Sequence, residues 1–123
     1  MPLLPVQRWF FEKPFENKHH WNQSVLLDVP AALELDRLER ALAHVIAHHP
    51  ALCLRFQRTA RGWRQWYGPA SDDVRIERFD LSRETDPVAA LTREANRLQR
   101  SFDLEQGPLF CFAAFSWSGE RRL

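Results

Sequence analysis

The residues best suited to chemistry lie close together near the start of the chain, between Leu3 and Ser24. A side-chain amide, Gln7, is followed by three large rings at Trp9, Phe10 and Phe11. So dense an aromatic cluster makes sense in a soluble chain only if the rings are buried. We therefore expect the rings to pack into a core and the Gln7 amide to be aimed at a bound group.

A second block follows a polar interruption and reads His19-His20-Trp21-Asn22-Gln23. It runs directly into a strand-like segment, so these polar side chains should lie where a strand begins. Two interpretations stay open for His19 and His20: they line a binding channel, or they pack against and cap the following strand.

Two other arrangements are weaker candidates for chemistry. His44 and His48 are spaced i, i+4 and could in principle bind a metal, but no carboxylate or further histidine stands at a supporting offset. A solvated helix face explains them better, so we expect no metal site. Ser24 and Ser116 have no histidine and aspartate in a recognisable triad order, which disfavours a hydrolase.

The remaining candidates point to structure rather than catalysis. Cys53 and Cys111 sit in apolar segments without metal-ligand spacing, which predicts buried free thiols. An aromatic and basic hairpin superficially suggests base stacking, through residues Arg61, Trp63, Arg64, Trp66 and Tyr67. The chain carries a net charge of only +1 and four glycines, with no phosphate-binding loop. We therefore expect no nucleic-acid partner.

Composition bounds the class of protein. The chain has 123 residues, of which 45% are hydrophobic and 27% charged, as in ordinary globular domains. That length corresponds to one domain or to part of a larger one. It contains no signal peptide and no apolar run long enough to span a bilayer. We therefore expect a cytoplasmic protein with no membrane partner.

The first elements are predicted from periodicity and punctuation. In the segment Pro2 to Pro5 the residues that precede the prolines should not be helical, and Asn22 to Val29 alternates like a strand. A helix is expected from Arg37 to about His49, with Asp36 as N-cap and Glu39 completing a capping box. Its buried stripe should consist of Leu35, Leu38, Leu42, Val45, Ile46 and His49, with Arg37, Arg40, His44 and His48 opposite.

The second half of the chain repeats this alternation. Strands are expected at Ala51 to Thr59, at Trp63 to Tyr67 as its hairpin partner, and around Val74 to Phe79. A second helix should start at Asp86-Pro87 and run to about Ser101, burying Val88, Leu91, Ala95, Leu98 and Phe102. Leu109 to Phe115 is apolar on both faces, as in an interior strand, and Arg121 to Leu123 begins another strand after a turn. The fold class predicted is α/β, a two-layer open sandwich with a mixed sheet and two helices.

Several of these segments together resemble a known family. Pro5-Val6-Gln7-Arg8-Trp9-Phe10 and His19-His20-Trp21-Asn22-Gln23-Ser24 resemble the P-x-Q-x-W-F and H-H-W-N-Q-S signatures of epimerisation domains in nonribosomal peptide synthetases. These domains belong to the condensation superfamily. The segments His49 to Phe56 and Ser101 to Leu109 resemble that superfamily's R-H-x-x-L-R-x-x-F and S-F-D-L-x-x-G-P-L elements.

The resemblance implies that residues 1–123 are the opening part of an N-terminal lobe similar to chloramphenicol acetyltransferase. The whole domain would invert the α-carbon of an aminoacyl or peptidyl thioester held on a carrier-protein phosphopantetheine, without metal or diffusible cofactor. Gln7, Trp9, Phe10, His19, His20, Asn22 and Gln23 are the implied substrate-channel or motif residues. The family's catalytic H-H-x-x-x-D-G occurs nowhere in the sequence, so we expect a domain truncated before it and assign no catalytic residue.

Cys53 stands where the family usually has an arginine. Three readings of function remain: an epimerisation-domain fragment inactive by itself, a non-catalytic remnant or carrier-protein interaction module, or a fragment of a peptide-bond-forming condensation domain. The expected partners are a peptidyl carrier protein and the rest of a synthetase. A second copy of the chain could also associate through the exposed edge of the C-terminal strand.

Overall fold

The computed structural model describes residues 1–69 and 74–123. Along the chain lie helix α1 (Pro5–Glu12), the short 3₁₀ helix η1 (Lys18–His20), helix α2 (Leu35–His48) and a second 3₁₀ helix, η2 (Pro50–Cys53). They are followed by strands β1 (Leu54–Thr59), β2 (Gly62–Tyr67) and β3 (Ile76–Asp80), helix α3 (Pro87–Arg100), and strands β4 (Phe112–Trp117) and β5 (Glu120–Arg122). No helix within the described ranges has the length and apolar character needed to cross a membrane.

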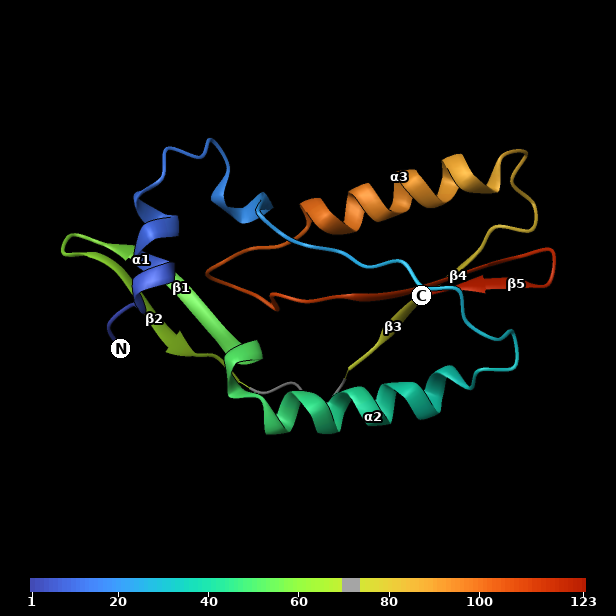
Figure 1. Ribbon diagram of the computed structural model, residues 1–123, viewed down its shortest axis with the longest axis horizontal. Coiled ribbons are helices and arrows are strands. Elements are labelled where there is room, and N and C mark those ends of the chain that lie inside the picture. The colour runs from blue at the N-terminus through green and yellow to red at the C-terminus, as the bar shows by residue number, and fades with distance from the viewer. Residues whose placement is uncertain (70–73) are drawn as a thin grey trace.

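A mixed sheet in the order β3-β4-β5 forms the centre of the molecule (Figure 1). β4 pairs in parallel with β3 and antiparallel with β5. Ser118 and Gly119 join β4 to β5 with φ values of 46° and 81°, as a tight hairpin turn of the primed type requires. The segment Leu27 to Val29 lies alongside β5, on the side away from β4. Leu27 exchanges backbone hydrogen bonds with Leu123, and Val29 donates to the carbonyl of Arg121.

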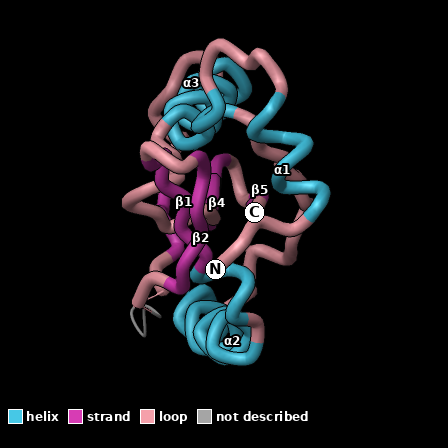
Figure 2. The backbone as a smooth tube through the Cα atoms, turned by 90° about the vertical axis from the view of Figure 1, so that its left-hand side faces the viewer, coloured by secondary structure: helices cyan, strands magenta, loops and turns pink. Residues whose placement is uncertain are grey.

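The two long helices lie on opposite faces of this sheet, above and below it in Figures 1 and 2. On one face the α3 residues Ala90, Leu91 and Leu98 pack with Leu81 and Phe115. On the other face lies a second cluster, formed by Ile46 of α2 with Cys53 and Val74 and flanked by Leu42, Phe110 and Phe112. Phe115 and Phe112 of β4 thus point to opposite faces of the sheet and pack in two different cores. The apolar pattern of Leu109 to Phe115 on both faces predicted this.

α1 and the β1–β2 hairpin lie at the end of the molecule opposite β5, on the left in Figure 1. The ring of Phe11 stacks on Trp63 with centroids 4.1 Å apart and contacts Phe56 at 5.3 Å. β1 and β2 form the expected antiparallel hairpin, in a register that places Thr59 opposite Gly62. The helix begins at Pro5, after an extended Leu4, so the prediction that Pro2 to Pro5 is not helical before its prolines is confirmed.

Three predicted strands are shorter than expected. From Asn22 to Leu26 the chain pairs with none of the described strands, so the strand prediction is wrong for these residues; the side chains of Asn22 and Ser24 bond to Gln99 of α3. Residues 51–53 belong to η2, and the strand starts at Leu54. Residues 109–111 precede β4, which leaves Cys111 exposed, contrary to the buried thiol expected there; Cys53 is buried.

Both helix faces also differ in part from the prediction. In α2 the centre of the buried stripe is Ile46, with Leu35, Leu38 and Leu42 half-buried, while Val45 and His49 are exposed. In α3 the N-cap is confirmed, since the Asp86 carboxylate accepts from the N–H of Ala89, but Val88 is exposed. Val45 and Val88 lie on the solvent-facing sides of their helices, and His49 lies just beyond the end of α2.

The predicted capping box of α2 is wrong. The helix starts at Leu35 rather than Arg37, with Glu34 at the N-cap and no side-chain cap. Asp36 bonds instead to Arg78, and Glu39 accepts from the backbone N–H of Ile76 at 2.9 Å. Both carboxylates therefore tie α2 to β3 rather than cap their own helix.

Candidate functional site

The N-terminal motif residues serve mainly the local structure of α1. The side-chain oxygen of Gln7 accepts from the N–H of Leu4 at 2.7 Å, so the amide satisfies an unpaired donor at its own helix start. Phe10 packs against both Phe15 and Trp21, in ring contacts of 5.5 and 6.3 Å. Trp9 does not join this cluster: it is 51% exposed, contrary to the expected burial, beneath the ammonium group of Lys13.

The His-His-Trp-Asn-Gln block is fastened to two distant parts of the chain. In η1, the Nδ1 atom of His19 accepts a hydrogen bond from the backbone N–H of Leu104 at 3.0 Å. This hydrogen bond uses the lone pair of Nδ1, so Nδ1 is the acceptor atom of the ring in this contact. The carboxylate of Asp103 lies 3.9 Å away and accepts from the N–H groups of Gln106 and Glu105, which lowers its pKa.

Asn22 fastens the same block to α3. Its Nδ2 donates to the carbonyl of Gln99 at 2.8 Å, in the last turn of α3, where helix carbonyls lack intrahelical partners. The side chain of Gln99 returns a bond to Ser24 at 3.2 Å. Trp21 stacks on Phe15 at 4.2 Å, while His20 is exposed at the end of η1.

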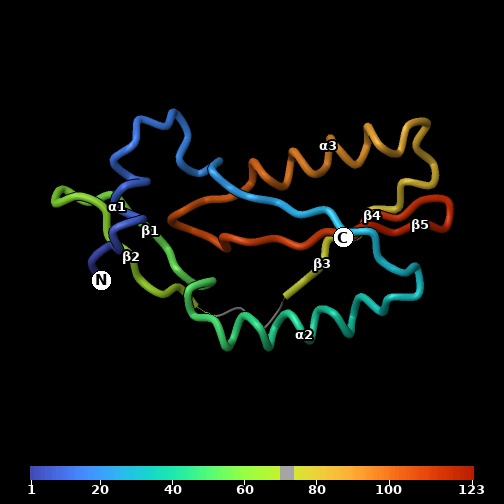
Figure 3. Tube along the Cα trace, in the orientation of Figure 1, coloured from blue at the N-terminus to red at the C-terminus, as the bar shows by residue number. Residues whose placement is uncertain are grey.

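Together these contacts form one wall of a mainly apolar groove of about 780 Å³. Its lining comes from the segment that leaves η1, the inner face of α3 and the start of β4. These three segments run alongside one another in Figure 3. Of the seven predicted site residues, His19, Asn22 and Gln23 line it. Gln7, Trp9, Phe10 and His20 do not, so the structure does not bring the predicted set together.

The titratable side chains that line this groove are Lys18, His19 and Cys111. The Nδ1 atom of His19 already accepts a hydrogen bond from Leu104. Partial desolvation of the Cys111 thiol by the groove raises its pKa, which favours the protonated form. Epimerisation needs an acid and a base on opposite sides of one carbon. The described lining of the groove includes no carboxylate side chain and is mainly apolar, which suits it to holding apolar groups.

One buried group was not anticipated from the sequence. The Arg55 side chain is 7% exposed, and its Nε donates to the carbonyl of Gln106 at 2.9 Å. A Cβ at position 107 would lie 2.0 Å from the guanidinium carbon, so any residue larger than glycine would displace the Arg55 side chain from this position. Arg55 thereby holds the Ser101–Leu109 segment against the hairpin. The sequence feature that could have indicated this contact is Gly107, in the Ser101–Leu109 segment. Its backbone has a φ of 62°, in the left-handed region that favours glycine.

A cluster of charges joins α2 to β3 away from the groove. Glu39 is buried, and the hydrogen bond from Ile76 lowers the pKa of its carboxyl, with Arg78 adding to the effect. The bond from Arg78 also lowers the pKa of Asp36. A hollow of about 510 Å³ beside them is lined by Arg40 and Arg75 as well, so it combines both signs of charge. These pairs connect two elements of the fold and show no reactive arrangement.

Comparison with known proteins identifies the family. Residues 1–123 match the family described as the condensation domain. One of the linear gramicidin synthase proteins of Brevibacillus parabrevis is 40% identical over 98% of this chain, and surfactin synthase subunit 2 of Bacillus subtilis is 41% identical over 87%. The chain spans only 2% and 3% of those two proteins.

Solved structures agree on the fold. The epimerization domain from the third module of tyrocidine synthetase B superposes over 99% of this chain with a TM-score of 0.89 and 28% identity. The chain covers 28% of that structure. The starter condensation domain of rhizomide synthetase matches 79% of the chain with a TM-score of 0.64 and 27% identity. The predicted α/β class is thereby confirmed, and the chain belongs to the condensation-domain family of nonribosomal peptide synthetases.

Proposed function

We propose that this chain forms the opening part of the N-terminal lobe of an epimerisation-type domain. The whole domain would invert the α-carbon of an aminoacyl or peptidyl thioester on a carrier-protein phosphopantetheine, in the cytoplasm and without a metal or diffusible cofactor. The observation that carries this proposal is the superposition with an epimerization domain over 99% of the chain, against 79% for the starter condensation domain. The peptidyl carrier protein and the remaining synthetase are the proposed partners.

The His-His-Trp-Asn-Gln block supports this assignment through its contacts. His19 and Asn22 connect it to Leu104 and Gln99, on either side of the Ser101–Phe102 junction. The block thus positions the segment that leads into β4, and with it one wall of the groove. In this proposal the motif acts by holding the lobe in shape rather than by transferring a proton.

A chimera distinguishes epimerisation from condensation. Residues 1–123 would replace the matching segment in an active epimerisation domain and, separately, in a peptide-bond-forming domain. We expect the first chimera to exchange the α-proton of a carrier-bound aminoacyl group with solvent deuterium and the second to lose peptide-bond formation. The reverse pattern would assign the chain to the condensation type. The isolated chain should show no exchange above a protein-free control, since it contains no H-H-x-x-x-D-G.

Self-association through the C-terminal strand also remains a proposal. β5 covers β4 from Phe115 to Trp117, so Phe112 and Ala113 lie beyond the pairing. An unpaired apolar edge can recruit a strand from another molecule. Sedimentation of the unmodified chain and of Phe112→Lys at tens of micromolar tests this; a monomer in both cases would rule out association through this edge.

A further inference from the structure

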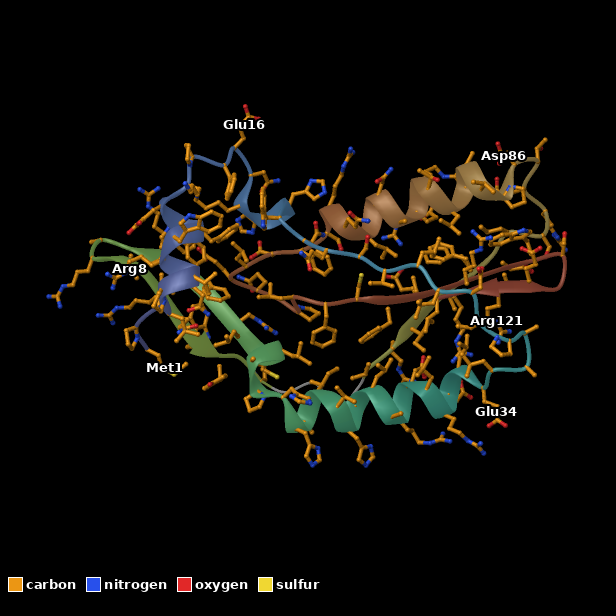
Figure 4. The ribbon with its side chains drawn as sticks, viewed as in Figure 1. Met1, Arg8, Glu16, Glu34, Asp86 and Arg121 are labelled. Atoms are coloured by element: carbon orange, nitrogen blue, oxygen red, sulfur yellow. The ribbon has the colours of Figure 1, made fainter. Side chains whose placement is uncertain are left out.

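A second hollow, of about 740 Å³, lies between α1 and the β1–β2 hairpin, at the opposite end of the chain from β5. Three arginines line it: Arg8 from α1, Arg61 from the hairpin turn and Arg64 from β2. Its wall includes the stacked rings of Phe11 and Trp63. We call this feature the arginine hollow. Figure 4 shows Arg8 at this end and Arg121 at the other.

The charge of the arginine hollow is not neutralised within the described part of the chain. No ion pair or side-chain hydrogen bond joins the side chains of Arg8, Arg61 or Arg64 to another described residue, and Glu12 is the one acid among the lining residues. Six of the other arginines have acidic partners within 4 Å, namely Arg37, Arg75, Arg78, Arg93, Arg97 and Arg122, whereas the control residue Arg83 has none among the described residues. Positive charge is therefore concentrated at one end of a chain whose net charge is only +1.

The arginine hollow is held open by the fold. Met1 and Gln65 exchange backbone hydrogen bonds, and the Gln65 side chain donates to the carbonyl of Pro2 at 2.6 Å. The stacked Phe11 and Trp63 fix α1 against the hairpin. A site fixed in this way loses little conformational entropy when a partner binds, which favours affinity.

The sequence motif on α1 contains residues that the fold itself does not use. Gln7 caps the helix and Phe10 and Phe11 pack in aromatic clusters, whereas the adjacent Arg8 and Trp9 are exposed. Arginine and tryptophan are enriched at the centres of protein interfaces. Both side chains are therefore available for contact with another molecule, and Arg8 is the one that lines the arginine hollow.

We propose that the arginine hollow docks an acidic, amphipathic segment of another protein. Carboxylates of the partner would bind Arg8, Arg61 and Arg64, and an apolar side chain would rest on the wall formed by Phe11 and Trp63. Arginine binds carboxylates in bidentate geometry, which gives such contacts direction. A nucleic acid fits less well, because its affinity depends on many phosphate contacts along an extended basic surface. This proposal does not depend on which reaction the whole domain catalyses.

A defined peptide tests the proposal on the 123-residue chain. The probe is an amidated, helix-forming peptide of glutamate, leucine and alanine with its glutamates on one face, and its neutral counterpart carries glutamine in their place. We expect the acidic peptide to bind about tenfold or more tightly than the neutral one, and less tightly as salt is added. Arg61→Glu and Arg8→Glu should each weaken binding by about tenfold.

The matched control is Arg83→Glu, which changes net charge equally but lies in the loop before α3, where Arg83 is exposed. It should leave binding unchanged. Equal weakening by Arg83→Glu, or equal binding of the neutral peptide, would overturn the proposal, as would competition by duplex DNA as effective as by the peptide. Circular dichroism verifies that each variant is folded, and Arg61→Gln provides a milder variant that should weaken binding in the same direction.

Discussion

The imidazole of His19 and the backbone N–H of Leu104 are joined by a hydrogen bond of 3.0 Å, although 85 positions separate them in the chain. This bond connects the His-His-Trp-Asn-Gln block to the segment that leads into β4. Leu104 lies outside the strands, so its backbone N–H depends on His19 for this hydrogen bond. His19 therefore has a structural role, whereas its neighbour His20 is exposed.

His19→Ala should therefore destabilise the chain more than His20→Ala. Removal of the acceptor leaves the N–H of Leu104 without its partner in a partly buried position, at a cost of about 1–2 kcal/mol. His20→Ala should cost less than about 0.5 kcal/mol, as for an ordinary surface substitution. Urea unfolding monitored by tryptophan fluorescence measures both. Equal midpoints for the two variants would show that the His19 bond does not stabilise the fold.

Gly107→Ala should be strongly destabilising, because an added Cβ would collide with the buried Arg55 guanidinium and Gly107 has a φ of 62°. Gly119→Ala is the matched control: its φ is 81°, but nothing lies within 4 Å of the added carbon. Both variants incur the left-handed backbone cost of about 1–3 kcal/mol, and only Gly107→Ala adds the collision.

A double variant separates the two contributions. In Arg55→Ala/Gly107→Ala the collision is absent, so the loss of stability should be smaller than the sum of the two single losses. Thermal or urea unfolding of the four proteins completes the cycle. Strict additivity would mean that the guanidinium and Gly107 do not meet in solution.

Acid should weaken the link between α2 and β3. The pKa of Glu39 is lowered from its ordinary value of 4.5, chiefly by the hydrogen bond from Ile76. A carboxyl with a lower pKa in the folded chain stabilises the fold fully above its unfolded pKa, and that contribution is lost as the pH falls through the folded pKa. Stability should therefore decline as the pH falls below about 4.5.

Glu39→Gln should be less stable than the unmodified chain at pH 7 and should lose less stability on acidification. Glu16→Gln is the control, since Glu16 is exposed and forms no ion pair with the described residues. Urea midpoints measured at neutral pH and near pH 3.5 give the comparison. An acid slope in Glu39→Gln as steep as in the unmodified chain would exclude Glu39 as its source.

The sequence was most informative where structure depends on near neighbours. Asp86 and Pro87 predicted the start of α3 because an N-cap bond spans only three residues. The β1–β2 hairpin was predicted for the same reason. Asn22 and Glu39 were misassigned because their partners, Gln99 and Ile76, lie 77 and 37 positions away. Local alternation and capping patterns contain no information about such partners.

For the candidate site too, the sequence predicted local features better than contacts between distant residues. Motif resemblance identified the family, but it grouped Gln7, Trp9 and Phe10 with His19 and Asn22 as one set of site residues. In the structure the first three belong to α1 and its aromatic contacts, and the last two line the groove. Residues that neighbour one another in a motif need not share a site, because a helix and an extended segment orient them differently.

The two cysteines should differ sharply in reactivity, which tests the placement of the groove. Cys111 is exposed and lines it, whereas Cys53 is buried between α2 and the sheet. Maleimide should label the native chain once, at Cys111, and should label both thiols in urea. Because the surrounding groove partly desolvates the Cys111 thiol and raises its pKa, labelling should be slower than for free cysteine at neutral pH and should accelerate as the pH rises. Mass spectrometry of Cys111→Ser and Cys53→Ser assigns the site. Native labelling at Cys53 instead would show that the start of β4 is covered and that the groove is closed in solution.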